Sequence, residues 1–256
     1  MQSMVKNPLV DPYITGVSSG AAFGAVLILY GSNLSFSIVY ALPLSAFIGA
    51  VGSFVLTMII ISYVGDNPTN FVLSGFIVGI FFSSLTTIII VTSENNNQSL
   101  FFWLFGSFAN MNWDKAIILI IGNFTLSSML MLYVREFNVI SMGDKQASEL
   151  GIDVKRLKKY IILVVSLLTA ISVSFTGIIG FIGLIVPHFA RILVGNDHRL
   201  LIPASMFLGA EILLIADILV RILFSPVEIP IGTVTSILGA PFFLYLLFSR
   251  GKVYDK

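Results

Sequence analysis

The order of apolar and polar residues along this chain predicts a series of membrane-spanning helices. No Asp, Glu, Lys or Arg occurs between Asp11 and Asp66, a stretch too long for one helix, since a ~30 Å hydrocarbon core needs about 20 residues. The turn-forming Gly31-Ser32-Asn33 divides this stretch into two spans, about 13–30 and 37–64. Six more spans are predicted at about 70–92, 115–134, 160–176, 181–194, 200–224 and 231–249. The pattern therefore predicts an all-α, polytopic transmembrane helical bundle of about eight spans, with residues 1–256 in one domain.

A short apolar run at 100–108 is too short to cross a bilayer and predicts an interfacial helix. It contains Trp103 and is followed by Trp113. Tryptophan is enriched at the level of the lipid headgroups. We therefore expect both indole rings to lie at the membrane–water interface.

The uncharged run from Tyr160 to Ala190 predicts a broken helix. As one helix it would span about 46 Å at 1.5 Å per residue, more than the bilayer thickness. It also contains the helix-breaking residues Gly177, Gly180, Gly183 and Pro187. One interpretation is a kinked helix that packs closely against its neighbours. The other is a broken helix at a transport pathway, because irregular backbone at membrane depth must be buried in protein or line a cavity.

Composition excludes several classes of protein. Hydrophobic residues make up 57% and charged residues 11% of the 256, with a mean hydropathy of +0.99, so a soluble or disordered chain is excluded. There is no Cys, hence no disulfide or thiolate metal site, and the net charge of +1 gives no nucleic-acid footprint. No phosphate-binding glycine loop with its lysine is present. We expect no ATP site, no cofactor and no metal site, and we interpret the isolated His188 and His198 as structural.

The Lys and Arg residues predict the orientation, because basic residues favour the cytoplasmic side. With the N-terminus inside, only Lys115 and Arg221 lie outside. The basic residues expected inside are Lys6, Arg135, Lys145, Lys155, Arg156, Lys158, Lys159, Arg191, Arg199, Arg250, Lys252 and Lys256. We therefore predict a multi-pass protein of the cytoplasmic (inner) membrane with both termini in the cytoplasm.

Residues 135–159 form the longest polar stretch and hold ten of the 27 charges. Ser141 is expected to cap a short cytoplasmic helix at about 142–150, which Gly151 ends. Because so short a helix is marginal in water, it must dock on this protein's own inner face or on a cytoplasmic partner. The candidate docking residues are Ser141, Met142, Gly143, Asp144, Ala147, Glu149, Leu150 and Gly151.

Three ionisable residues lie in the span at 200–224. Asp217 and Arg221 are four residues apart and can form an ion pair on one helix face. Glu211 has no evident partner on its helix; ionisable groups inside a membrane are a functional hypothesis by default, although a bond to a neighbouring helix explains it equally well. In an earlier span, Gly20 and Gly24 form a small-residue pair of the kind that packs helices together.

The sequence resembles the FecCD family, the membrane permeases of ABC importers for iron–siderophores, haem and cobalamin. The likeness runs over essentially the whole chain and is densest at 175–245. The motifs that carry it are Lys6-Asn-Pro-Leu-Val-Asp-Pro12 with Gly16 and Gly20-Ala21, Met142-Gly-Asp with Ala147 and Leu150-Gly151, Gly180-Phe-Ile-Gly-Leu-Ile-Val-Pro-His-Phe-Ala-Arg191, Gly195-Asn-Asp-His-Arg199, Gly209-Ala210, Ala216-Asp217, Arg221, Glu228-Ile-Pro-Ile-Gly232 and Gly239-Ala-Pro-Phe-Phe243.

The resemblance implies a permease homodimer with its translocation path between the two copies. It implies a cytoplasmic ABC ATPase dimer docked on the coupling segment 141–151, and an extracytoplasmic solute-binding protein whose carboxylates face Arg221. The cargo would be an iron–siderophore-type chelate, haem or cobalamin, and ATP would be hydrolysed by the partner, not by this chain. The alternative is a secondary transporter driven by an ion gradient, with Glu211 and Asp217 as the ion relay.

The resemblance also places residue 1 near the inner end of the family's second helix. Relatives usually have ten spans, so two appear absent here. We accordingly expect that this chain alone does not transport without an upstream helix pair.

Overall fold

Each apolar segment that the sequence pattern predicts forms a helix in the computed structural model, which describes residues 1–2, 10–31, 38–65, 67–92 and 102–254. No strand occurs within these residues. The elements of the apolar segments are η1 (Pro12–Thr15), α2 (Val17–Gly31), α3 (Ile38–Val64), α4 (Pro68–Thr92), α6 (Trp113–Met131), α9 (Val154–Thr176), α10 (Ile182–Val194), α11 (His198–Leu223) and α12 (Ile231–Tyr254). Two short helices, α7 (Val134–Met142) and α8 (Asp144–Glu149), lie between α6 and α9. The predicted all-α bundle is confirmed.

Side chains just before three of the helices explain where those helices begin. Asn112, Asp153 and Asp197 each accept a hydrogen bond from a backbone N–H in the first turn of α6, α9 and α11, respectively. Such bonds satisfy donors that have no partner inside the helix. The polar residues between the apolar runs therefore fix the helix starts as well as the turns.

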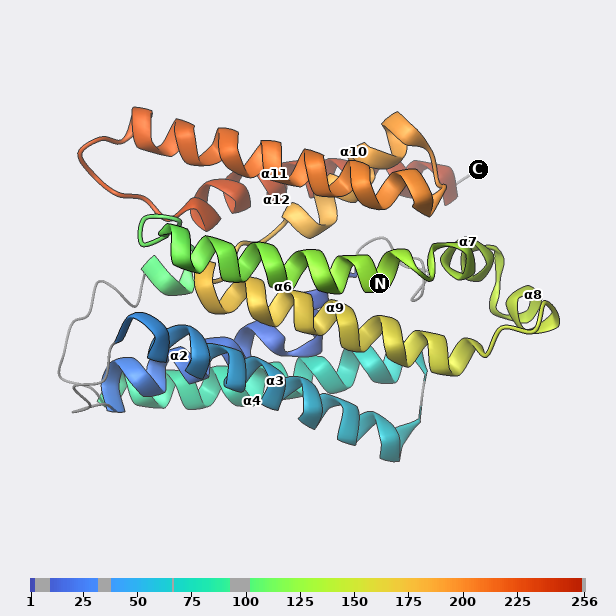
Figure 1. Cartoon of the computed structure of the whole chain (residues 1–256), viewed down its shortest axis with the longest axis horizontal. Helices are drawn as coiled ribbons and strands as arrows, with labels where there is room; N and C mark the ends of the chain where they lie inside the picture. The colour runs from blue at the N-terminus through green and yellow to red at the C-terminus, as the bar shows by residue number, and fades with distance from the viewer. Residues whose placement is uncertain (3–9, 32–37, 66, 93–101, 255–256) are drawn as a thin grey trace.

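Most of the helices run along the long axis of the molecule, and they form three groups that lie side by side (Figure 1). Helices α2, α3 and α4 pack together on one side, and α10, α11 and α12 lie together on the other. Helices α6 and α9 run between the two groups, with α9 against α2 and α3. Helices α7 and α8 project at one end of the bundle, which we call the α8 end (Figure 1).

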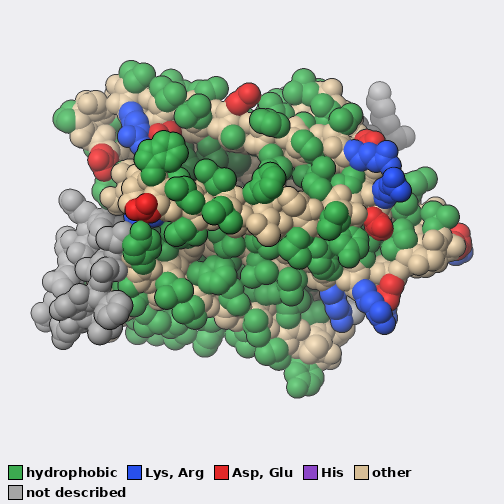
Figure 2. Space-filling model, viewed as in Figure 1, with side chains coloured by type: hydrophobic (Ala, Val, Ile, Leu, Met, Phe, Trp, Pro, Cys, Tyr) green, Lys and Arg blue, Asp and Glu red, His purple; other side chains and the backbone are tan. Residues whose placement is uncertain are grey.

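Among the residues that the structure describes, length and hydropathy identify four helices that could cross a membrane by themselves: Tyr40–Val64, Thr69–Thr92, Trp113–Met131 and Val154–Thr176. The apolar parts of α2, α10 and α12 are shorter. Charged side chains gather near the two ends of the molecule, and Lys and Arg mostly at the α8 end, while the surface between is largely hydrophobic (Figure 2). The arrangement fits a protein embedded in a bilayer, and the count of eight spans stays a prediction.

The seam between α2 and α3 is built on glycine. A Cβ on Gly20 would lie 2.3 Å from the Gly49 carbonyl oxygen, and one on Gly24 would lie 2.1 Å from the Ser45 carbonyl oxygen. Close approach of backbones is what small residues allow in membrane helices. The predicted packing role of Gly20 and Gly24 is therefore confirmed, and Gly49 supplies the matching small residue on α3.

One expectation about the short run at 100–108 is wrong. Residues 102–104 are helical, but the Trp103 side chain is only 8% exposed and lies within the hydrophobic core. Trp113, in contrast, is 79% exposed. Trp103 is buried because its segment folds back against the break after α9, a contact that hydropathy alone does not reveal. Lys6, the turn at Ser32-Asn33 and the polar loop at 93–98 lie outside the described residues.

Candidate functional site

The predicted coupling segment forms two helices instead of one. Helix α7 runs through Ser141 to Met142, and α8 begins at Asp144, with Gly143 between them at a φ of +151°. Ser141 is therefore not an N-cap, and its hydroxyl donates to the Asn138 carbonyl oxygen inside α7 at 2.6 Å. The predicted end is confirmed in outline, since α8 stops at Glu149 and Gly151 adopts a φ of +81°.

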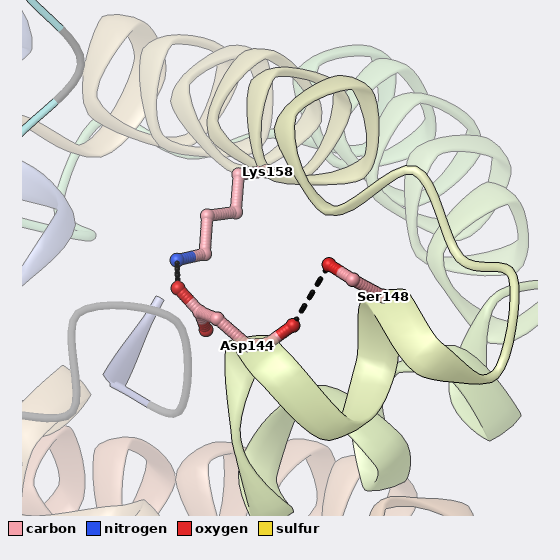
Figure 3. Close-up of polar contacts among 3 residues, drawn as sticks. All are labelled: Asp144, Ser148 and Lys158. Atoms are coloured by element: carbon pink, nitrogen blue, oxygen red, sulfur yellow. Dashed lines mark hydrogen bonds and ion pairs between the residues drawn. The ribbon is translucent and has the colours of Figure 1, made fainter.

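Helix α8 is held in place from both of its ends. The Asp144 carboxylate forms an ion pair with Lys158 of α9, and the Ser148 hydroxyl donates to the Asp144 carbonyl oxygen at 3.0 Å (Figure 3). After the helix, the backbone N–H of Ile152 bonds to the carbonyl oxygen of Ala147, whose side chain is fully buried. A six-residue helix that is marginal alone is thus fixed by tertiary contacts.

Two large apolar side chains of this segment point away from the protein. Met142 is 74% exposed and Leu150 is 70% exposed, whereas Ile140 is 1% exposed. Glu149, beside Leu150, is also exposed. The buried side chains account for docking on the protein's own helices, which leaves Met142 and Leu150 as an apolar surface at the α8 end.

Asn138 joins α7 to the turn between α10 and α11. Its amide Nδ2 donates to the Asp197 carboxylate at 2.7 Å, and its Oδ1 accepts from the backbone N–H of His198 at 2.9 Å. The backbone N–H of Arg199 and the Asn138 amide hold the pKa of the Asp197 carboxyl below its usual range, so that carboxylate accepts only. Sequence reasoning quoted Asp197 only as part of the motif at 195–199 and did not predict its bond to Asn138, because the pairing spans 59 residues.

The amide orientation of Asn138 also determines whether Nδ1 of the His198 ring carries a hydrogen. Because Nδ2 must donate to Asp197, Oδ1 faces His198 and can only accept. The ring Nδ1 of His198 lies 2.7 Å from this oxygen, which requires the hydrogen to be on Nδ1. The interpretation of His198 as a structural residue agrees with these contacts.

The predicted break in the helix after α9 is present at residues 177–181. Gly177 has a φ of +72°, and a Cβ there would lie 2.0 Å from the Trp103 carbonyl oxygen. A Cβ on Gly106 would lie 2.6 Å from the Ile178 carbonyl oxygen, and one on Gly232 would lie 2.0 Å from that of Phe105. Three backbone segments therefore meet at these glycines, which we call the glycine junction (Gly106, Gly177 and Gly232).

Backbone N–H and C=O groups at the break, which lack a partner inside a helix, form hydrogen bonds to other parts of the protein. The Tyr13 hydroxyl donates to the Ile179 carbonyl oxygen at 3.1 Å and accepts from the Ile179 N–H at 3.4 Å. The Ser107 N–H donates to the Thr176 carbonyl oxygen at 2.8 Å. Irregular backbone at membrane depth requires such partners. Sequence reasoning missed Tyr13, because a lone tyrosine near a helix start carries no signal of a partner 166 residues away.

The other residues of the predicted break have different surroundings. A Cβ on Gly180 would meet its nearest atom only at 3.7 Å, and Pro187 lies inside α10, which continues past it. Phe181, which the sequence did not flag, takes the left-handed conformation at φ +68° as α10 begins. Gly183 and Pro187 line an apolar cavity of about 410 Å³ between α7, α9, α10 and α11.

The ionisable residues of α11 do not form one site. The Arg221 Nε donates to Asp217 Oδ2 at 2.8 Å, and both line a small pocket of about 230 Å³ at the end of the bundle opposite α8. The Arg221 side chain is nevertheless 60% exposed. Glu211 is exposed on the surface of α11, about 120° around the helix from Asp217 at 3.6 residues per turn. Asp217 and Glu211 are therefore not brought together as a relay.

A groove of about 890 Å³ follows α4. It is lined by small and hydroxyl-bearing residues of α4, namely Thr69, Gly75, Gly79, Ser83, Ser84 and Thr87, with apolar residues between them. Only 17% of the apolar window of α4 is buried in the single copy. Among the described residues, no group of three or more His, Asp or Glu side chains is placed to hold a metal ion.

Comparison with known proteins gives one consistent result. The model of the FecCD transport family matches residues 1–249. The chain is 39% identical over 255 residues to the cobalamin import system permease protein BtuC of Halobacterium salinarum, covering 98% of this chain and 67% of that protein. It is 36% identical over 249 residues to the Fe(3+)-citrate import system permease protein YfmE of Bacillus subtilis, covering 96% and 74%.

The fold is also similar to solved structures. A structure described as an inward-facing conformation of an ABC transporter of the metal-chelate type superposes with a TM-score of 0.88 at 35% identity, covering 97% of this chain and 79% of that one. PsaBC from Streptococcus pneumoniae, in complex with a Fab, superposes with a TM-score of 0.60 at 20% identity and is similar in fold alone.

Proposed function

The chain belongs to the FecCD transport family, and from this premise we propose that it is the membrane permease of an ABC importer for a bulky metal chelate or corrinoid. The observation that carries the proposal is the likeness to import permeases over nearly the whole chain, with 39% identity to a cobalamin permease and 36% to an Fe(3+)-citrate permease. The permease is a transport component, and hydrolysis of ATP belongs to a partner ATPase. The membrane is the cytoplasmic one, with the α8 end in the cytoplasm.

The ATPase docks on the end of α7 at Met142 and on α8. This assignment is supported by the exposed Met142 and Leu150, which lie in the longest polar stretch of the chain and project at the end where most basic residues gather. Apolar side chains outside the bilayer that no other part of the chain covers favour a protein partner. ATP binding would then move these helices and switch the path between its two open states.

The translocation path lies between two copies of the chain, along the groove of α4. The groove is large enough to contribute one wall of a path for a chelate, at about 890 Å³. Glycines and hydroxyl side chains there permit close approach of a second helix or of a polar cargo. Because the chain has no Cys, a single Ser83→Cys variant should form a disulfide between copies or react with aqueous thiol reagents.

A matched control exists on α6, where Ser128 is exposed and does not line the groove of α4. Ser128→Cys should neither cross-link nor react with aqueous reagents. Equal behaviour of the two variants would contradict the placement of the path on α4.

The rim pocket at Asp217 and Arg221 receives the solute-binding protein. Support comes from its position at the end opposite α8 and from the exposed guanidinium of Arg221. Charge pairs at a rim mainly steer association. Asp217 holds the arginine in place instead of taking part in an ion relay, which disfavours the gradient-driven alternative.

Uptake in proteoliposomes tests the proposed function. The permease, its ATPase and its binding protein would be reconstituted with radiolabelled ferric hydroxamate, ferric citrate or cobalamin. We expect uptake of one of these that requires ATP inside and survives an uncoupler. Uptake without the ATPase that an uncoupler abolishes would instead establish the secondary transporter.

A further inference from the structure

The turn between α10 and α11 is tied to the coupling segment through one side chain. Asn138 bonds to the Asp197 carboxylate and to the backbone N–H of His198, at 2.7 and 2.9 Å. His198 is only 9% exposed, and its ring lies edge-on to Phe137 at 6.1 Å between centroids. Outside its own group of helices, α11 makes its main helix contact with α7. We call this set the α7–α11 clamp (Asn138, Asp197 and His198).

Helix α11 reaches from this clamp to the opposite end of the molecule. Its 26 residues, His198–Leu223, span about 39 Å at 1.5 Å per residue, which is the thickness of a bilayer. The first turn lies in the clamp, and the last two turns carry Asp217 and Arg221, which line the rim pocket. The helix is continuous between the two places, with Pro203 near its start, and a shift of a continuous helix is one of the ways in which switching proteins carry movement between sites.

The clamp demands an amide at position 138. Asp197 offers only acceptors, and the backbone N–H of His198 offers only a donor, so the joining side chain must donate in one direction and accept in the other. Asparagine does both from one planar group. An aspartate has nearly the same shape, but it would place a second carboxylate 2.7 Å from that of Asp197, where like charges repel strongly.

We propose that Asn138 is the positioning residue through which movement of the coupling helices reaches α11 and, along it, the rim where the binding protein docks. This inference rests on the proposed function. It assigns the coupling between the two ends of the transporter to one side chain and one helix. Loss of the clamp should leave both docking surfaces intact and break the communication between them.

The test uses the full complex of permease, ATPase and binding protein in proteoliposomes. For Asn138→Asp we expect normal membrane levels, normal co-purification of the ATPase and basal ATP hydrolysis within about twofold of wild type. Stimulation of hydrolysis by the cargo-loaded binding protein, and uptake of cargo, should each fall at least tenfold. Asn112→Asp is the matched control, because aspartate also caps helices, and it should behave as wild type.

A double substitution tests whether the hydrogen bond between residues 138 and 197 matters, and not only the identity of residue 138. Asn138→Asp combined with Asp197→Asn restores one donor and one acceptor with their places exchanged. We expect it to recover most of the stimulation and uptake that Asn138→Asp loses. A merely structural role for Asn138 would not produce this rescue of signalling at unchanged protein levels.

The outcomes that overturn the inference are distinct from those that overturn the proposed function. Full stimulation in Asn138→Asp, loss of ATPase co-purification in that variant, or failure of both the single and the double variant to accumulate would each refute transmission through the clamp. Absence of binding-protein stimulation and uptake in the wild-type complex would refute the proposed function and the inference with it.

Discussion

The α2–α3 seam and the α7–α11 clamp join helices in opposite ways. In the seam, Gly20, Gly24 and Gly49 bring backbone against backbone, and the neighbouring Ala21, Ala25, Ala46 and Ala50 are completely buried. In the clamp, one amide bridges two helices that also meet through the buried rings of Phe137 and His198. Packed backbones leave no alternative position within reach, whereas a hydrogen-bonded side chain can move with its partner or release it.

This difference suggests which parts of the molecule move. We expect the side of the bundle made by α2, α3 and α4 to behave as one rigid body, and the α7–α8 segment is connected to α11 through hydrogen bonds of a side chain. An importer needs both, because the path must switch between two discrete arrangements without losing its shape. Four substitutions outside the clamp test this division, and they are ordered here by the size of the expected effect.

The largest effect is expected from Gly49→Ala in the seam. The added Cβ would lie 2.1 Å from the Gly20 carbonyl oxygen, a backbone atom that cannot move alone, so we expect a loss of about 3 kcal/mol or more of stability. Membrane yield and a monodisperse peak in detergent measure this. Gly52→Ala on the same helix meets nothing within 4 Å and should be neutral or stabilising by up to ~1 kcal/mol. Similar losses in both variants would mean that the seam is not the fixed part.

A loss nearly as large is expected from Gly177→Ala at the glycine junction. Its φ of +72° and the Trp103 carbonyl oxygen 2.0 Å from the new Cβ both oppose a side chain, and we expect about 2–3 kcal/mol. Thermal unfolding in detergent provides the measurement. Gly180→Ala, three residues on, would place its Cβ at an ordinary contact distance of 3.7 Å from the Ser236 hydroxyl and should change the melting temperature little. A larger drop in melting temperature for Gly180→Ala than for Gly177→Ala would contradict the packing role of the glycine junction.

In the α7–α8 segment, Leu150→Asp should leave the fold intact and abolish co-purification of the ATPase. Its side chain is 70% exposed, so a charge costs the permease little, but it spoils an apolar interface. Leu150→Met keeps the apolar contact and serves as control. Retained co-purification with full ATP hydrolysis in Leu150→Asp would show that the ATPase docks elsewhere.

A smaller and salt-sensitive effect is expected from Arg221→Glu. Reversal of a rim charge should weaken docking of the binding protein at least about fivefold at low salt and much less at high salt. Lys115→Glu, a charge reversal at the same end outside the rim pocket, is the control. If Arg221 serves only to neutralise Asp217, the variant lowers permease stability, and a compensating charge on the binding protein does not restore binding.

How much could be predicted from the sequence differs between the fold and the site. Most helix ends were predicted within a few residues, for example 200–224 against His198–Leu223, because charges, Gly and Pro act locally. Helix α9 begins at Val154, before the predicted start at about 160, because its first turns carry the charged residues that mark the edge of the membrane span. The short helix predicted at about 142–150 corresponds to α8 (Asp144–Glu149), but the predicted start at Ser141 is wrong. Ser141 is a good cap in isolation, yet Gly143 divides the segment, and α7 continues through Ser141 because Val134, Phe137 and Ile140 are buried along one face.

The sequence by itself determined the class of protein: an all-α membrane bundle of the FecCD family, its helices, and the glycine-rich break. The helices and the break follow from hydropathy and backbone preference, which each segment carries with it, and the family follows from the motifs that the chain shares with it. Only the tertiary structure decided that Gly49 cannot carry a side chain while Gly52 can, that Trp103 is buried, and that Tyr13 and Asn138 bond to segments 166 and 59 residues away. Such contacts depend on which helix face meets which partner, and that is fixed only when the helices pack together.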